Sequence, residues 1–333
     1  MTSNLAMNIG LSLLGIALFA ILPWIFPSAA VTDFIIYVAA YGLLAMSLNM
    51  LVGLTGLVAF GHALFFAFGA YCFGLLMQSG NVSIPAAVVL TVIGSAVLST
   101  VTGVICVRLK DVYFSFITLA FQMLFYSIVL TWVSLTGGDQ GLLGGIPKPA
   151  FLGIDLGNGY NQYLFCITLF ALCAIIMRQV WQSPFGYTLR LIRDNATRAD
   201  FLGVNVFAMK LAVFVLSGAM ASVGGVILAL FVSGAYPEFG FWTTSGDAIF
   251  ALMLGGTKLF LGPLLGAFLL ELIEHFVRAH TEYQNFVLGV IILLIVLGLR
   301  RGIGDHLYDL VTKARKRRQK PVAIGKLAEA PDA

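Results

Sequence analysis

The sequence SIPAAVVLTVIGSAVLSTVTGVICV occupies residues 83–107 and contains no charged side chain over its whole length. A membrane-spanning helix needs about 20 consecutive apolar residues, because each residue advances the helix by about 1.5 Å through a hydrocarbon layer about 30 Å thick. Backbone N–H and C=O groups find no water in lipid, so a spanning segment must satisfy them within itself. This stretch therefore predicts a transmembrane helix.

Similar apolar runs recur along the chain and decide its class. They predict about ten transmembrane helices, although the last run is short and Gly246 interrupts the run 241–257. The expected fold is therefore an all-α polytopic membrane protein. The runs are 8–26, 31–53, 57–78, 83–107, 112–135, 163–179, 210–232, 241–257, 261–277 and 286–299.

Composition excludes the soluble classes of protein. Hydrophobic residues make up 60% of the chain and charged residues 10%, whereas soluble domains have about 45–50% and about 25%. The net charge of +4 does not indicate a nucleic-acid partner, because the basic residues gather at predicted membrane edges. The four cysteines lie in apolar runs without CxxC or Cys–His spacing, so they indicate neither a disulfide framework nor a metal site.

The uneven distribution of Lys and Arg sets the expected orientation. With ten spans, 16 of the 19 Lys and Arg residues fall on one face, which the positive-inside rule assigns to the cytoplasm together with both termini. We expect a transmembrane domain over 1–312, whose first run is a retained span. A basic, disordered cytoplasmic tail that can bind anionic lipid is expected over 313–333. The loops 136–162 and 233–240 fall on the opposite face.

Two glycine-rich stretches interrupt the apolar pattern, one over 53–71 and one from Gly255 to Gly266. Glycine costs up to about 1 kcal/mol in a helix interior, so this density indicates either close helix packing or a broken helix that lines a pathway. His62 is either a packed, hydrogen-bonded side chain or a ligand contact. His62 and Asp247 are the main ionisable candidates within the predicted spans, which gives an ion-coupled carrier little support.

The loop 183–210 predicts two short helices on the cytoplasmic face. Ser183 can cap the first with Pro184 at its first position, and Gly203 can end the second. One apolar stripe recurs at three- and four-residue spacing, formed by Leu189, Ile192, Ala196 and Ala199. Such an amphipathic segment either lies on lipid or fills a groove on a partner protein.

The sequence lacks several common nucleotide-binding and catalytic motifs. It has no GxxxxGK[ST] pattern, so it carries no recognisable ATP site, and it has neither HExxH nor GxSxG. Near its C-terminal end, charged residues at i, i+4 spacing indicate a solvated helix end with salt bridges, or else an edge that docks an external protein. They are Glu271, Glu274, His275, Arg278 and Glu282.

Four groups of residues between about 48 and 267 form a more specific pattern. The first is Leu48-Asn49 with Gly61-His62-Ala63 and Gly69-Ala70-Tyr71. The second is Tyr113-Phe114, Thr118-Leu119-Ala120-Phe121 and the loop Thr136-Gly137-Gly138-Asp139. The third is Ser183, Gly186, Ile192-Arg193-Asp194 and Leu202-Gly203, and the fourth is Leu254-Gly255-Gly256, Gly262-Pro263 and Leu265-Gly266-Ala267. This pattern resembles the permease subunits of ABC importers for branched-chain amino acids, and the Thr-Gly-Gly loop favours the M-type over the shorter H-type subunit.

The resemblance implies a multi-pass protein of the bacterial inner membrane that pairs with a second, H-type or related permease. Two cytoplasmic ATPase subunits would bind ATP and Mg, an extracytoplasmic binding protein would deliver substrate, and this chain would bind no cofactor. The segment coupled to the ATPase would comprise Gly186, Leu189, Arg190, Ile192, Arg193, Asp194, Ala199, Leu202 and Gly203. The candidate substrate pathway comprises Asn49, Thr55, Gly56, Gly61, His62, Thr118, Gly255 and Gly256.

The substrate stays open at this point. Relatives of such permeases import leucine-type amino acids, urea or short amides, and the phenylalanine-rich run 65–68 suits a hydrophobic amino acid better than urea. The run 257–260, TKLF, departs from the family pattern of a small polar residue and another glycine after the paired glycines. The alternatives are a urea or short-amide permease, or a stand-alone channel or secondary carrier that needs no ATPase.

Overall fold

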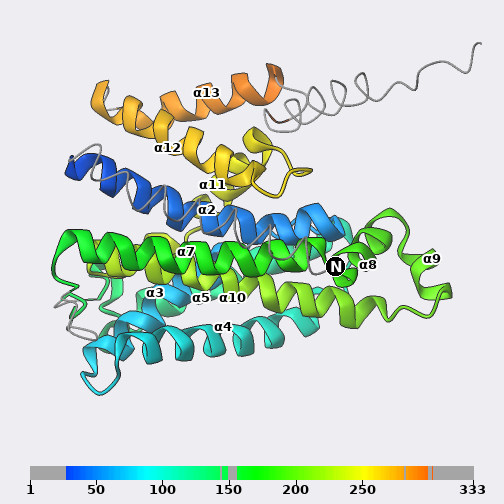
Figure 1. Cartoon of the computed structure of the whole chain (residues 1–333), viewed down its shortest axis with the longest axis horizontal. Helices are drawn as coiled ribbons and strands as arrows, with labels where there is room; N and C mark the ends of the chain where they lie inside the picture. The colour runs from blue at the N-terminus through cyan, green and yellow to red at the C-terminus, as the bar shows by residue number, and fades with distance from the viewer. Residues whose placement is uncertain (1–27, 143–144, 149–155, 281–282, 299–301, 303–333) are drawn as a thin grey trace, which may run out of the picture.

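The computed structural model describes residues 28–142, 145–148, 156–280, 283–298 and 302. All regular elements in these ranges are helices (Figure 1). They are α2 (Ala29–Thr55), α3 (Ala63–Gln78), α4 (Ile84–Cys106), α5 (Asp111–Thr131), α6 (Val133–Thr136), η1 (Gly138–Gln140), α7 (Gly159–Gln182), α8 (Pro184–Asp194), α9 (Ala196–Phe201), α10 (Val206–Val232), η2 (Pro237–Gly240), α11 (Trp242–Gly255), α12 (Gly262–His280) and α13 (Gln284–Gly298).

Five described helices are long and apolar enough to cross a membrane, namely α2, α4, α5, α7 and α10. The other predicted runs in the described ranges form α3, α11, α12 and α13, which are shorter or more polar. The run 8–26 and the tail 313–333 lie outside the described residues. The all-helical, polytopic character that the apolar runs predict is therefore confirmed, and the count of ten stays a prediction.

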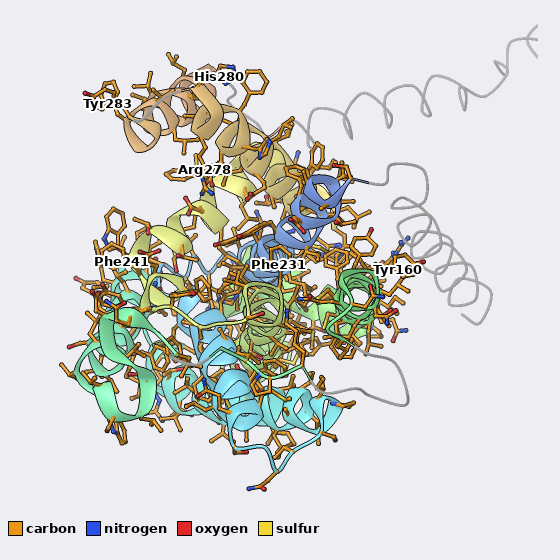
Figure 2. The ribbon with its side chains drawn as sticks, turned by 90° about the vertical axis from the view of Figure 1, so that its left-hand side faces the viewer. Tyr160, Phe231, Phe241, Arg278, His280 and Tyr283 are labelled. Atoms are coloured by element: carbon orange, nitrogen blue, oxygen red, sulfur yellow. The ribbon has the colours of Figure 1, made fainter. Side chains whose placement is uncertain are left out.

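Helices α2 and α10 form the centre of the bundle. Within the apolar window of each, 78% is buried inside the chain, whereas the corresponding share is 28–33% for α4, α5 and α7. Seen along the bundle, the outer helices lie around this pair (Figure 2). The glycines of α10 fit this central position, because added Cβ atoms on Gly224 and Gly225 would meet the backbone of α2 and α3.

The chain folds into two interrupted hairpins that run in opposite directions. Helix α2 ends beside α8, and α3 returns from residue 63. Helix α10 starts beside α9 and ends at the opposite end of the bundle, and α11 returns from residue 242. The long members have 27 residues each, and the short members have 16 and 14. Inverted repeats of this kind are common in transporters and place broken helices near the middle of the membrane.

Both long helices end on a residue in the left-handed conformation. Gly56 has φ of 76° and ends α2, and Ser233 has φ of 57° and ends α10. The expectation of one helix over 57–78 is therefore wrong, because the chain is non-helical until α3 begins at Ala63. The interruption expected at Gly246 is also absent, since α11 continues through it.

The expected outer loop 233–240 needs a further correction. It does not stay at the end of the bundle, because Gln122 Nε2 in the middle of α5 donates hydrogen bonds to the carbonyls of Gly240 and Phe241 at 3.1 and 2.8 Å. The segment thus returns into the bundle before α11 starts. The counterpart of the break over 56–62 is this segment rather than the glycine-rich turn after Gly255.

Candidate functional site

One face of α5 carries the polar side chains that fix both breaks. Ser115 Oγ donates to the carbonyl of Val58 at 2.6 Å. Thr118 Oγ1 donates to the carbonyl of Ser115 at 2.7 Å and accepts from the backbone N–H of Gly61 at 3.3 Å. Gly61 lies so close to α5 that an added Cβ would overlap the Thr118 carbonyl. The first break is therefore held against the middle of α5 by Ser115 and Thr118.

Gln122 and Ser245 join the second break to the first. Ser245 Oγ donates to Gln122 Oε1 at 2.7 Å and accepts from the backbone N–H of Ala63 at 2.9 Å. The first turn of α3 and the first turn of α11 thus meet at one buried hydroxyl. We call Ser115, Thr118, Gln122 and Ser245 the central polar cluster. All four side chains are buried, with exposed fractions of 7% or less.

Removing the Gln122 amide is expected to destabilise the whole bundle. Gln122→Leu leaves the carbonyls of Gly240 and Phe241 and the hydroxyl of Ser245 without their partner, and each unsatisfied buried group costs about 1–3 kcal/mol. We expect the free energy of unfolding in detergent to fall by at least about 3 kcal/mol. Ser127→Ala, at an exposed position of the same helix, is the control. Equal thermal midpoints for the two variants would contradict the assigned network.

His62 sits between α2, α3 and α10. The hydroxyl of Ser47 donates to the carbonyl of Leu44, and the hydroxyl of Ser217 donates to the carbonyl of Ser47. The Nε2 atom of His62 lies within hydrogen-bond distance of both hydroxyls, at 2.9 Å from Ser47 Oγ and 3.4 Å from Ser217 Oγ. The buried Nδ1 of His62 makes no hydrogen bond within the described residues.

The remaining candidate pathway residues fall into two other places. Thr55 Oγ1 donates to the carbonyl of Leu51 and Gly56 takes the left-handed conformation, so both shape the end of α2. Gly255 is the last residue of α11 and Gly256 follows it, and a Cβ on Gly255 would overlap the carbonyl of Gly262 at the start of α12. Only Gly61, His62 and Thr118 lie at the central break.

Asn49 lies one helical turn before Gly53, a position where three segments of the chain pack closely; we call this position the Gly53 joint. It is 1% exposed, and its side-chain amide makes no hydrogen bond within the described part of the chain. An added Cβ on Gly53 would lie 2.7 Å from Asn49 Oδ1, 2.7 Å from the Trp181 ring and 3.1 Å from the Thr257 carbonyl. Helix α2, the end of α7 and the turn between α11 and α12 therefore converge at Gly53.

The two short helices expected in the loop 183–210 are confirmed as α8 and α9. Ser183 Oγ accepts from the backbone N–H of Gly186 at 3.2 Å with Pro184 at the first position, and Gly203 follows α9 with φ of 82°. Asn195 caps α9 by accepting from the N–H of Arg198 at 2.8 Å. Local capping chemistry fixes this segment.

The apolar stripe of this segment packs on the chain itself. Leu189, Ile192 and Ala199 are buried, at 2% exposure or less, in the same core as α2 and α7. Neither lipid nor a partner groove covers them, which corrects both alternatives for the stripe. Gly186 is also buried, against the backbone of Val180 and Trp181. The exposed candidates for coupling are Arg193, Asp194, Leu202 and Gly203.

Two arginines of α8 bind backbone carbonyls at and near the Gly53 joint. Arg193 Nη1 donates to the carbonyl of Gly53 at 2.7 Å. Arg190 donates to the carbonyl of Trp181 at 2.6 Å, and its guanidinium lies over the Trp181 and Tyr187 rings at 5.2 and 5.0 Å. The last turn of α2 is therefore linked to α8 by a direct bond, a few residues before the first break.

The charged residues of α12 are partly as expected. Arg278 donates to Glu274 at 2.9 Å in an i, i+4 salt bridge, and Arg278 is seen below His280 in the view along the bundle (Figure 2). Glu282 lies outside the described residues. Asp247 lies on α11 two residues after Ser245, and the charged groups that act on it are Glu274, Glu271 and Arg278 of α12. No hydrogen bond within the described residues joins Asp247 to His62.

The sequence pattern missed several residues of the central region. Ser115 and Gln122 fix the breaks, and Ser47 and Ser217 hold His62, but none was among the candidate residues. One signal was available, because Ser115, Thr118 and Gln122 recur at i, i+3 and i+7 in an otherwise apolar helix.

Most of this chain is similar in sequence to known proteins. Residues 30–296 match the sequence model of a family described as the permease component of branched-chain amino acid transport systems. The chain is 25% identical over 286 residues to the high-affinity branched-chain amino acid permease LivM of Salmonella typhimurium, covering 79% of this chain and 67% of LivM. It is 25% identical over 286 residues to LivH of Escherichia coli, covering 80% and 91%.

A more distant substrate class also occurs among the similar proteins. The xylose transport system permease XylH of Escherichia coli is 30% identical over 168 residues, which cover 48% of this chain and 42% of XylH. No solved structure matches the chain.

Proposed function

Because the chain belongs to the branched-chain amino acid transport system permease family, we propose that it forms half of the pathway of an ABC importer for branched-chain or other small hydrophobic amino acids. Members of this family are permeases of the bacterial inner membrane, and the relatives are named as transport permeases rather than as enzymes. A second permease subunit completes the pathway. An extracytoplasmic binding protein delivers the substrate.

Two separate ATPase subunits supply the energy in this proposal. They bind ATP and Mg, and this chain binds no cofactor. The absence of a GxxxxGK[ST] pattern from the sequence supports this division of labour. ATP binding on the partners shifts the populations of conformations that open the pathway to one side or the other.

We place the α8 end of the bundle in the cytoplasm. Most described Lys and Arg residues lie at this end, and the positive-inside rule assigns such an excess to the cytoplasm. They are Arg108, Lys110, Arg178, Arg190, Arg193, Arg198, Lys210 and Lys258, against Lys148 and Arg278 toward the other end. With the run 8–26 as a further span, ten crossings put both termini on the same side.

The segment α8–α9 is the proposed docking site for the ATPase. Its tip exposes large apolar side chains, with Phe201 88% and Leu202 68% exposed. At a cytoplasmic end these side chains meet water or protein rather than lipid, so burial in a partner groove is favourable. The single observation that carries the coupling role is the bond from Arg193 to Gly53, because it ties this segment to α2 just before the first break.

We propose that the substrate pathway passes the central polar cluster and His62, at the depth of the middle of α5. The two breaks meet there, at the middle of α5, and re-entrant backbone at this depth is typical of substrate sites in transporters. Gly61, His62 and Thr118 are the candidate residues at this level. Asn49, Thr55 and Gly56 lie toward the α8 end, where motion of α8 would reach the pathway first.

Charging the tip of α9 is expected to detach the ATPase. Phe201→Glu should reduce co-purification of the ATPase with the permease at least about tenfold, because burying an unpaired carboxylate in an apolar groove costs several kcal/mol. The matched control is Tyr283→Glu, since Tyr283 is a 76% exposed aromatic residue that directly precedes α13, whose start lies at the opposite end of the bundle from α9 (Figure 1). Both variants should keep the thermal midpoint of the unmodified permease.

Two outcomes would overturn the proposal. The first is full ATPase binding and substrate-stimulated hydrolysis by Phe201→Glu. The second is substrate flux into liposomes that contain this chain without any ATPase, which would make it a stand-alone channel or carrier. Competition by leucine, urea and short amides for ATP-driven uptake tests the substrate class in the same vesicles.

A further inference from the structure

We propose that one side of the bundle, formed by the exposed side of α5 with Glu238, Trp242 and Thr243, packs on the second permease subunit and forms one wall of the substrate route. We call this side the α5 face. It lies on the perimeter of the bundle where Phe241 is seen in Figure 2. The inference rests on the proposed function and adds which surface the partner takes.

The α5 face exposes polar groups at a depth where lipid cannot satisfy them. Thr243 is exposed, and it is the second residue of α11, next to the Phe241 carbonyl that Gln122 binds in the middle of α5. The backbone N–H groups of Trp242 and Thr243 donate to no acceptor within the described residues. Glu238, also exposed, makes no ion pair there. Non-helical backbone at membrane depth is tolerated only against protein or a water-filled cavity.

Both breaks reach this side of the molecule. Phe60 of the first break is 36% exposed, and its ring contacts that of the exposed Phe116 on α5 at a centroid distance of 6.4 Å. Phe241, at the end of the second break, contacts the ring of Tyr126 on α5 at 5.1 Å. A pathway controlled by the breaks would therefore open toward the α5 face.

Helix α4 shows what a lipid-facing surface of this chain looks like. Its exposed side is a continuous stripe of β-branched aliphatic side chains at four-residue spacing, each 49–60% exposed: Val89, Ile93, Val97, Val101 and Ile105. The exposed Thr100 beside this stripe donates to the carbonyl of Ala96 at 2.7 Å, so lipid tails can cover the surface without loss of hydrogen bonds. The exposed side of α5 carries a comparable apolar stripe, formed by Val112, Phe116, Leu124 and Ile128. What distinguishes the α5 face from α4 is therefore the exposed Glu238 and Thr243 and the backbone N–H groups at the start of α11, which favour protein beside α5 and lipid beside α4.

The occupant is a second permease rather than another protein of the complex. The ATPase is assigned to α8–α9 and the binding protein to the opposite end, whereas the α5 face runs between them along the spans. Only another membrane-embedded chain can cover a surface at that depth. A homologous subunit would bring its own breaks to the same level and complete a two-walled route.

Photo-crosslinking in the assembled complex tests this assignment. A benzophenone side chain is introduced by Leu124→p-benzoylphenylalanine on the α5 face, or by Ile93→p-benzoylphenylalanine on α4. The two positions are near mid-span and similarly exposed, at 56% and 54%. We expect the probe at Leu124 to give a covalent adduct with the second permease and the probe at Ile93 to give none.

A second measurement covers the case in which the bulky probe disturbs packing. Thr243→Cys should react with a charged, membrane-impermeant thiol reagent at least about tenfold faster than Val97→Cys, because a thiol in lipid is not ionised. An adduct from Ile93 but not from Leu124, or equal labelling of the two cysteines, would overturn the inference. A complex that holds no second permease at all would instead overturn the proposed function.

Discussion

Replacing Arg193 by alanine is expected to reduce ATP-driven uptake by at least about tenfold while the ATPase stays bound and continues to hydrolyse ATP. Arg193 Nη1 donates to the Gly53 carbonyl at 2.7 Å, and this bond is the direct link between α8 and the end of α2. A hydrogen bond from a charged donor contributes about 1.5–3 kcal/mol, and each 1.4 kcal/mol corresponds to about tenfold. Losing that coupling energy gives the expected decrease in uptake.

Arg193 acts in this scheme as a positioning residue, so the measurement must separate coupling from docking. The ratio of substrate transported to ATP hydrolysed is measured in vesicles, together with the amount of bound ATPase. Arg193→Lys should recover part of the ratio, because its ammonium can still donate to the Gly53 carbonyl. If Arg193 only stabilised the fold, its removal would lower the thermal midpoint and would leave the ratio of substrate transported to ATP hydrolysed unchanged.

Arg108→Ala provides the matched control. Arg108 lies at the same end of the bundle, is exposed, and stacks over the Phe207 ring at 5.6 Å without reaching either break. Its replacement should change the transport ratio by less than about twofold, as expected for an exposed stacking contact. Unchanged uptake by Arg193→Ala, or loss of bound ATPase in that variant, would contradict a coupling role for the bond to Gly53.

Sequence reasoning predicted the parts of the fold that lipid and local chemistry decide. The runs 31–53, 83–107 and 210–232 correspond to α2, α4 and α10, because a long apolar run with at most one charged residue has only the helix available in a membrane. The start of α8 at Pro184 and the turn at Gly203 followed from capping preferences that act within a few residues.

The second break could not be located in the same way. The segment 233–240 contains Gly234, Pro237 and Gly240, which are equally suited to a loop outside the membrane and to one that returns into it. What decides between them is Gln122, more than one hundred residues earlier in the chain. Because Gln122 is so far away in the sequence, no residue pattern near the loop indicates that the two are in contact.

The apolar stripe on α8–α9 is a second case in which the sequence pattern did not predict the tertiary contacts. Periodicity indicates that Leu189 and Ile192 face something apolar, but it does not say what covers them. The chain's own α2 and α7 do so, and the side chains left for a partner are those outside the stripe, such as Phe201 and Leu202. The proposed docking surface therefore depends on intramolecular contacts that periodicity does not predict.

The largest effect on folding is expected at the crossing of α3 and α10. An added Cβ on Gly69 would lie 2.6 Å from the Ser222 Cα, and one on Gly225 would lie 2.9 Å from the Ala70 nitrogen and overlap the Phe66 carbonyl. These obstacles are backbone atoms, which cannot rotate away as a side-chain end can. Small residues at such crossings let membrane helices pack at close range.

Gly225→Ala should therefore separate the helices and lower the free energy of unfolding in detergent by about 3 kcal/mol or more, at the upper end of the usual cost of overpacking. Gly246→Ala is the same substitution in α11, where an added Cβ finds only the Phe250 ring at 3.9 Å, an ordinary contact distance. That variant should be neutral or more stable by up to about 1 kcal/mol, because alanine favours helix over glycine.

The two glycine variants should also differ in their effect on the first break, which precedes α3. The crossing of α3 with α10 fixes where α3 starts, and Ala63 at that start donates to Ser245 in the central polar cluster. Displacing α3 should therefore reduce substrate uptake by any Gly225→Ala protein that still folds, whereas Gly246→Ala should retain it. Equal stability and equal uptake for the two variants would show that the backbones do not touch at this crossing.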